Sequence, residues 1–213
     1  MSLLELKNIS YSYDKKKYVL KDVSYTFEKG KIYGIVGKSG AGKTTLLSLL
    51  SSLASPTSGQ ILLENEDISK IDKYKFRSTE IGVIFQNFNL LTHLTARENV
   101  ILSMDISAKK IPDKKKHAAE LLKKVEIDDD DIDRRVLQLS GGQQQRVAIA
   151  RSLSYDPDII LADEPTGNLD GETQSGIMKI FRSLADEGKC VIIVTHSPDV
   201  AREADVVYEL SKK

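Results

Sequence analysis

Residues 32–44 read Ile-Tyr-Gly-Ile-Val-Gly-Lys-Ser-Gly-Ala-Gly-Lys-Thr. The first five residues form a short apolar run, which is typical of a strand buried on both faces of a sheet. A glycine-rich turn follows, and from Lys43 to Leu53 leucines recur at positions compatible with a helix. A buried strand that turns sharply into a helix predicts an α/β core with a mainly parallel sheet.

The turn itself, Gly37–Thr44, fits the pattern G-x-x-x-x-G-K-[ST] of a phosphate-binding loop. Its glycines let successive backbone N–H groups face inward, and the helix N-terminus adds a positive dipole end. We expect Lys43 to reach the β- and γ-phosphates of a nucleoside triphosphate and the Thr44 hydroxyl to bind Mg²⁺. The predicted nucleotide-binding residues of this segment are Gly37, Lys38, Ser39, Gly40, Ala41, Gly42, Lys43, Thr44 and Thr45.

A second segment, Ile159–Glu164, supplies carboxylates at the end of another apolar strand. Ligands of open α/β sheets collect at the carboxyl ends of the strands, where Asp163 would emerge. Asp163 is therefore expected to hold Mg²⁺ beside Thr44. The adjacent Glu164 is the candidate to orient and polarise an attacking water.

The rest of the chain alternates between strand and helix patterns. Several short strands are expected within residues 3–36, helices at 142–154 and about 171–187, and a buried strand at Cys190–Thr195 that holds the single cysteine. Residues from about 88 to 140 have a different, Lys-rich character, and we expect a mainly helical insert there. Its acidic run, Asp128–Asp131, is interpreted as solvated surface rather than a metal site.

Composition narrows the function classes. The 213 residues contain 31 Lys plus Arg and 31 Asp plus Glu, so the balance gives no sign of a nucleic-acid partner. No apolar stretch approaches the length of a transmembrane helix, and one cysteine fits a reducing compartment. We expect a cytoplasmic protein that contacts a membrane only through a partner.

The segment Leu139–Gln143, Leu-Ser-Gly-Gly-Gln, is the most specific of the motifs. Ser140 can cap the following helix, and Gln143 three positions later completes a capping box. Gly141 and Gly142 allow a ligand to approach the backbone closely. These four residues predict a second anion-binding helix end, suited to a γ-phosphate, which a P-loop kinase would not explain.

With these motifs the chain resembles the ATP-binding cassette (ABC) ATPases over essentially its whole length. Gly37–Thr44 resembles the family's Walker A motif, Ile159–Glu164 its Walker B motif, and Leu139–Gln143 its signature. By the same resemblance, Gln86 matches the Q-loop glutamine that senses Mg²⁺, Asn168–Asp170 the D-loop, His196 the switch histidine that contacts the γ-phosphate, and Tyr13 the aromatic residue that stacks on adenine, with Tyr11 and Tyr18 as alternatives.

The resemblance implies one ABC ATP-binding domain over residues 1–213, with an N-terminal antiparallel β subdomain and a helical subdomain at about 88–140 inserted in a RecA-like core. It implies ATP and Mg²⁺ as ligands, and Glu164, His196 and Gln86 as catalytic residues. In this family two cassettes sandwich two ATP molecules head to tail. Each site would combine Lys43 and Glu164 of one copy with Ser140 of the other.

The amino-acid sequence of residues 85–91, 98–100 and 162–170 is similar to that of one branch of the family. That branch serves lipoprotein release, macrolide and antimicrobial-peptide or bacteriocin export, and cell-division signalling. The expected function is to power export or extraction through a separate permease at the inner face of the membrane, and the alternative is signalling through a membrane partner. Apolar residues after Gln86 either dock that partner or belong to the core of the insert: Phe88, Leu90, Leu91 and Leu94.

Overall fold

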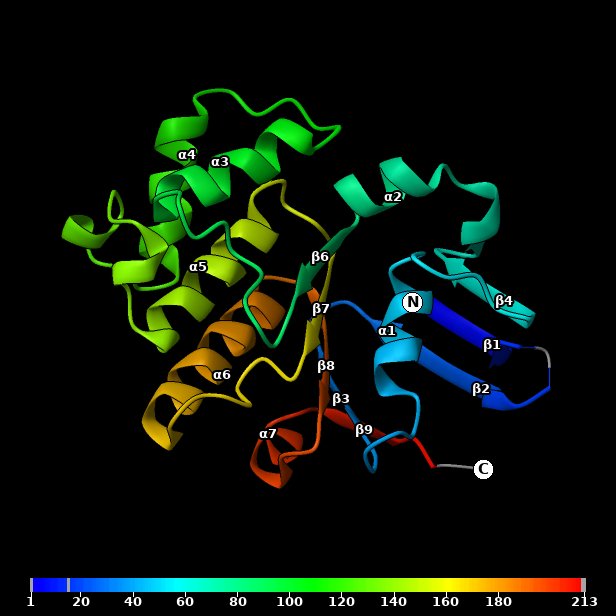
Figure 1. The fold of residues 1–213 in the computed structure, drawn as a ribbon. Coiled ribbons are helices and arrows are strands. Elements are labelled where there is room, and N and C mark those ends of the chain that lie inside the picture. Colours follow the sequence, from blue (N-terminus) through cyan, green and yellow to red (C-terminus); the bar gives the residue numbers. More distant parts are fainter. Residues whose placement is uncertain (1, 15, 212–213) are drawn as a thin grey trace.

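Two sheets and a group of helices make up the computed structural model, which describes residues 2–14 and 16–211 (Figure 1). One sheet is antiparallel, with strand order β2-β1-β4-β5, and the other is parallel, with order β6-β7-β8-β3-β9. The strands are β1 (Ser2–Ser12), β2 (Tyr18–Glu28), β3 (Ile32–Val36), β4 (Ser58–Leu63), β5 (Glu66–Asp67), β6 (Ile81–Ile84), β7 (Ile159–Asp163), β8 (Cys190–Thr195) and β9 (Val206–Glu209). The helices are α1 (Lys43–Leu50), α2 (Lys73–Thr79), α3 (Ala96–Ile106), α4 (Lys114–Lys124), α5 (Gly141–Leu153), α6 (Gly171–Asp186) and α7 (Pro198–Arg202), with short 3-10 turns at Ile68–Lys70, Asp129–Asp131 and Val136–Gln138.

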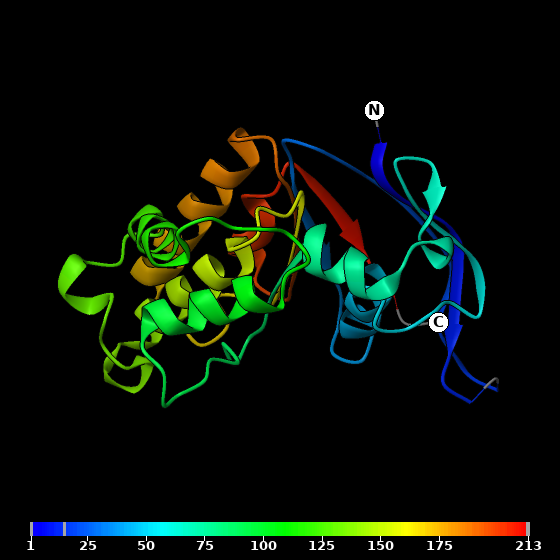
Figure 2. The ribbon, with the colours of Figure 1, turned by 90° about the horizontal axis from the view of Figure 1, so that it is seen from above.

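The parallel sheet is covered on both faces, which is why its strands are continuous apolar runs. Successive residues of one strand belong to different cores: Ile160 packs with the helices α3 to α6, whereas Ile159 packs with α1 and the antiparallel sheet. Viewed from above, these two groups lie on opposite sides of the sheet (Figure 2). Cys190 is fully buried in β8, as predicted. The α/β fold with a parallel sheet and an N-terminal antiparallel sheet is confirmed.

The N-terminal region contains two strands of 11 residues each, not several short ones. Asn8 and Asp22 have left-handed backbones, with φ of 51° for both, and the register between β1 and β2 shifts near them. Such bulges interrupt the alternation of apolar and polar residues without ending the strand. The sequence pattern therefore divided each long strand into pieces.

Two other expectations need correction. Helix α1 ends at Leu50, because the chain turns at Ser52, with a φ of 56°, and leaves Leu53 with 64% of its surface exposed. In the acidic run, Asp131 is buried rather than solvated. Its carboxylate accepts a hydrogen bond from Gln143 Nε2 at 2.5 Å and pairs with Arg134 at 2.6 Å.

Between β6 and α5 the chain forms α3, α4 and the connecting turns, which pack against α5. A capping box starts α3, where Thr95 accepts from the Glu98 N–H at 3.1 Å and Glu98 accepts from the Thr95 N–H at 2.8 Å. Leu90 packs on this helical core, while Leu91 has 42% of its surface exposed. In the described part of the chain, no helix has both the length and the apolar character needed to cross a membrane.

Candidate nucleotide-binding site

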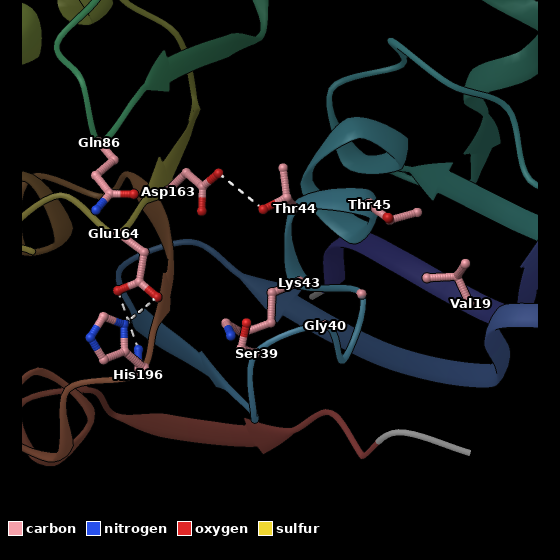
Figure 3. Close-up of a pocket in the computed structure, with 11 residues that line it drawn as sticks. Val19, Ser39, Gly40, Lys43, Thr44, Thr45, Gln86, Asp163, Glu164 and His196 are labelled. Carbon is pink, nitrogen blue, oxygen red and sulfur yellow. Dashed lines mark hydrogen bonds and ion pairs between the residues drawn. The ribbon is translucent and has the colours of Figure 1, made fainter. Parts of the chain in front are cut away.

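A cavity of about 690 Å³ opens at the carboxyl ends of β3, β7 and β8 (Figure 3). Most of the residues around it are hydrophilic and come from segments far apart in the sequence. The lining residues are Val19, Ser39, Gly40, Gly42, Lys43, Thr44, Thr45, Gln86, Asp163, Glu164 and His196. Ten of the predicted site residues, all of them outside the signature segment, are thus brought together around one cavity.

The glycine-rich loop connects β3 to α1 and requires its glycines. Gly40 and Gly42 have φ of 76° and 98°, in the region that residues with a Cβ rarely adopt. A Cβ at Gly37 would lie 2.4 Å from the carbonyl oxygen of Leu210. The Lys43 ammonium donates to the carbonyl of Gly37 at 2.8 Å and lies 3.4 Å from that of Lys38, so it lies inside the loop. Gly37, Lys38 and Ala41 support the loop without lining the cavity.

Opposite this loop, the end of β7 brings a carboxylate to the start of α1. Asp163 Oδ2 accepts a hydrogen bond from Thr44 Oγ1 at 3.3 Å, although 119 residues separate the two. Burial raises the pKa of Asp163, and the neighbouring Glu164 adds to the rise, while the Thr44 hydrogen bond and Lys43 act against it. A hydroxyl and a carboxylate converging in this way supply oxygen ligands of the kind that Mg²⁺ prefers.

Glu164 and His196 form a pair at the adjacent edge of the cavity (Figure 3). His196 Nδ1 lies 2.8 Å from Glu164 Oε1, and the His196 backbone N–H donates to Oε2 at 3.2 Å. Glu164 has a left-handed backbone, with φ of 47°, and its N–H donates to the carbonyl of Val194 at 2.9 Å. A non-glycine residue rarely adopts this conformation. Here the hydrogen bond to Val194 in β8 stabilises it.

Gln86 approaches the same end of the cavity from the chain that leaves β6. Its Nε2 lies 3.2 Å from the point where a Cβ would stand on Gly167, so the missing side chain of that glycine makes room for the amide. Gly167 belongs to the turn that begins at Glu164, whose carbonyl accepts the Gly167 N–H at 3.1 Å. Gln86 therefore packs against the loop that follows the two carboxylates.

Tyr13 stands near the opposite end of the loop, beside α1. Its hydroxyl lies 3.0 Å from Thr45 Oγ1, 72% of its surface is exposed, and the ring of Tyr11 makes an edge contact with it at a centroid distance of 5.0 Å. Tyr18 lines a different cavity. Val19 lines the main cavity and was not foreseen, because its position there depends on β2 passing close to Gly42, where an added Cβ would meet Val19 Cγ1 at 3.0 Å.

The signature residues lie elsewhere. Ser140 caps α5, accepting from the Gln143 N–H at 3.3 Å, while Gln143 Oε1 accepts from the Ser140 N–H at 2.9 Å, so the predicted capping box is present. Gly142 packs against α6, where a Cβ would meet Thr173 Cγ2 at 2.5 Å. Helices α5 and α1 belong to opposite faces of the parallel sheet, and none of Ser140, Gly141, Gly142 and Gln143 lines the cavity.

Comparison with known proteins gives one consistent result. The family model described as "ABC transporter" matches residues 20–167. The ABC transporter ATP-binding protein YclH of Bacillus subtilis, itself uncharacterized, is 45% identical over 100% of this chain and 95% of its own. The macrolide export ATP-binding/permease protein MacB of Salmonella typhimurium is 42% identical over 98% of this chain, which spans 33% of MacB.

A solved structure agrees with these relatives. The dimeric structure of a post-hydrolysis state of the cassette MJ0796, a protein of Methanocaldococcus jannaschii, bound to ADP and Pi, superposes with a TM-score of 0.87 and 38% identity, covering 99% of this chain and 96% of that one. The chain therefore belongs to the ABC transporter family, as one of its ATP-binding and ATP-hydrolysing cassettes.

Proposed function

We propose that the chain hydrolyses ATP between two copies of itself and uses the cycle to drive a membrane partner. The observation that carries the proposal is the arrangement around one cavity. The Lys43 ammonium and the start of α1 face it from one side, and the Asp163 and Glu164 carboxylates from the other. This arrangement suits positioning and electrostatic stabilisation, which supply most of the catalysis of phosphoryl transfer.

Each residue has a distinct role in the proposed reaction. The Lys43 ammonium and the N–H groups of those loop residues between Ser39 and Thr45 that line the cavity bind the phosphates. Glu164 orients and polarises the attacking water, and His196, held on Glu164 at 2.8 Å, keeps that carboxylate in place and contacts the γ-phosphate. Tyr13 stacks on the adenine from its exposed position beside Thr45.

The oxygens of Thr44, Asp163 and Gln86 form a set that fits Mg²⁺. Two of them already converge, since Thr44 Oγ1 and Asp163 Oδ2 are 3.3 Å apart. When bound, Mg²⁺ would neutralise charge on the β- and γ-phosphates. Burial raises the pKa of Asp163, which means that keeping this carboxylate ionised costs free energy. The positive charge of Mg²⁺ would offset that cost.

A second copy is needed because the chain separates its two phosphate-binding helix ends. Helix α5 starts on one face of the parallel sheet and α1 starts on the other. Ser140 therefore cannot complete the cavity of its own chain in this arrangement, whereas a copy related by a two-fold axis can present its Ser140 to Lys43. The dimeric structures of the MJ0796 cassette support this assembly.

The membrane partner is the part of the proposal that concerns biological function. We assign the chain as a single ABC domain, with residues 88–140 as the helical subdomain that docks a separate permease, which would hold it at the inner face of the membrane. Leu91, exposed just after Gln86, is a contact in this docking. MacB is named as a macrolide export protein that contains both an ATP-binding part and a permease. Its similarity supports the proposal that this chain serves an exporter of the same branch.

Reconstitution tests the proposal. The chain is co-expressed with the product of a neighbouring permease reading frame, purified in detergent and returned to liposomes with Mg-ATP. Export is supported if a peptide, macrolide or lipoprotein-like substrate raises ATP turnover and changes sides of the membrane in an ATP-dependent way. A complex that hydrolyses ATP and moves none of these compounds would instead favour signalling through the membrane partner.

A further inference from the structure

The chain that follows Gln86 makes a turn with an unusual backbone. Phe88 and Asn89 are consecutive residues with left-handed conformations, at φ of 58° and 50°. The Phe88 N–H donates to the Phe85 carbonyl at 3.1 Å, so the turn begins directly at the end of β6. Left-handed backbone is unfavourable for a bulky residue such as phenylalanine, and such turns persist only where their surroundings hold them.

Arg151 holds this turn. Its Nη2 donates to the carbonyl of Phe88 at 2.8 Å, and its Nη1 donates to the carbonyl of Asn89. The planar guanidinium thus binds two successive carbonyls, a geometry for which its rigid fork of N–H groups is suited and a lysine is not. No ion pair joins Arg151 to a carboxylate within residues 2–14 and 16–211. Burial lowers the pKa of Arg151, and the two carbonyls solvate its charge.

The contact joins two segments that have different roles in the proposed reaction. On one side the turn continues back to Gln86, which lines the nucleotide cavity. On the other side, Arg151 belongs to the last turn of α5, the helix that Ser140 caps at its start. Arg151 lies eleven positions after Ser140 along this helix, a rise of about 16 Å along the helix axis. The segment after β6 runs alongside α5 on its way to α3 (Figure 1).

We infer that Arg151 is a positioning residue that fastens the turn after Gln86 to the signature helix, so that Gln86 and Ser140 move together when nucleotide binds. This inference rests on the proposed roles of Gln86 and Ser140 in hydrolysis. Arg151 acts through both residues and lies outside the nucleotide cavity. Its removal should therefore impair turnover and leave the binding of ATP to a single chain unchanged.

Three variants test the inference: Arg151→Gln, Arg151→Lys and the control Arg77→Gln. Arg77 is a matched control because it lines the same cavity of about 340 Å³ as Arg151 and also donates to a carbonyl, that of Ser52 at 3.2 Å. It donates no hydrogen bond to the carbonyls of Phe88 and Asn89. We expect Arg151→Gln to lower kcat about tenfold, with the binding of a fluorescent ATP analogue changed less than about twofold. Arg77→Gln should keep the wild-type kcat.

The lysine variant separates charge from geometry. Lysine keeps the positive charge but has no planar fork, so Arg151→Lys should restore less than about half of the lost turnover. Hydrogen exchange should be faster at the amides of Phe88 and Asn89 in both Arg151→Gln and Arg151→Lys, with the amides of α5 unchanged. Full activity in Arg151→Lys would show that positive charge alone suffices. It would overturn the proposal that the two-carbonyl contact of Arg151 positions the turn.

A double-mutant cycle with Gln86→Ala decides whether Arg151 acts through Gln86. If Arg151 acts through Gln86, the double variant should hydrolyse ATP at nearly the rate of Gln86→Ala alone. In Gln86→Ala the side chain that Arg151 would position is already missing. Multiplicative losses in the double variant would mean that Arg151 affects turnover independently of Gln86, and the inference would fail. The proposed function is judged separately: if Gln86→Ala itself keeps full turnover, the role of Gln86 is wrong, whatever Arg151 does.

Discussion

Replacing Ser140 with alanine separates two roles that one side chain performs. In the structure the Ser140 hydroxyl accepts one backbone hydrogen bond, from Gln143 at 3.3 Å, and alanine removes it. Losing a cap of this kind costs about 1 kcal/mol of stability. For a chain of this length the loss corresponds to a fall in Tm of about 2–4 °C.

Thr95→Ala is the matched control. Thr95 forms the same kind of capping box with Glu98 at the start of α3, with a backbone contact of 3.1 Å, and it does not line the nucleotide cavity. Both variants should therefore lose a similar amount of stability in thermal unfolding. Only the proposed contact with the partner's ATP distinguishes Ser140 from Thr95.

Steady-state ATPase activity at saturating Mg-ATP measures that contact. A hydrogen bond to a charged group contributes about 1.5–3 kcal/mol, so Ser140→Ala should lower turnover by about 10- to 100-fold. Thr95→Ala should keep the wild-type rate, and both should bind a fluorescent ATP analogue as single chains with wild-type affinity. Equal losses of activity in the two variants, or weaker ATP binding to the single Ser140→Ala chain, would contradict a role for Ser140 in the partner's site.

Four further variants, at three residues, address the proposed nucleotide site. Lys43→Ala should weaken ATP binding itself, by about 10- to 100-fold for a lost charge-assisted contact, as a fluorescent-nucleotide titration would show; unchanged affinity would contradict its role. Tyr13→Ala should weaken binding by about 5- to 100-fold through the lost stacking, whereas Tyr13→Phe, which removes only the hydroxyl beside Thr45, should bind normally; equal losses would exclude stacking. Asp163→Asn should raise the Tm of the nucleotide-free protein while abolishing Mg²⁺-dependent turnover. Because burial raises the pKa of Asp163 in the folded state, its ionised form destabilises the fold above that pKa, and the penalty falls as pH decreases through it. The gain in Tm should therefore be present at pH 7 and shrink towards pH 4, and a gain independent of pH would contradict this assignment.

The central strands were predictable because they are buried on both faces. The sequence has continuous apolar runs at residues 32–36, 159–162 and 190–195, as expected of strands that expose neither face to water. The structure forms strands there, and their bounds differ from those of the apolar runs by at most one residue. The short helix α2 and the long strands β1 and β2 were harder to predict. Their patterns mix apolar and polar residues, and bulges at Asn8 and Asp22 conceal the continuity of the strands.

For the site, the sequence motifs predicted which residues lie close together but gave no distances. The Thr44–Asp163 contact joins residues whose types suggested a shared Mg²⁺, and the structure brings them within 3.3 Å. Arg151 carries no such motif: it reads as an ordinary basic residue near a helix C-terminus, and the carbonyl of Phe88 that it binds lies 63 residues away. Contacts to backbone carbonyls depend on the fold and leave no signature in residue types.

The two-copy ATP site is tested most directly by the mass of the Glu164→Gln variant in solution. Glutamine keeps the shape of the side chain but cannot polarise water as the carboxylate does, so ATP should bind, remain intact and hold two chains together. Static light scattering should give the chain mass of 23.7 kDa without nucleotide and twice that mass with Mg-ATP. A variant that is saturated with ATP and still scatters as a single chain would contradict the proposal that Ser140 of one copy completes the site of the other.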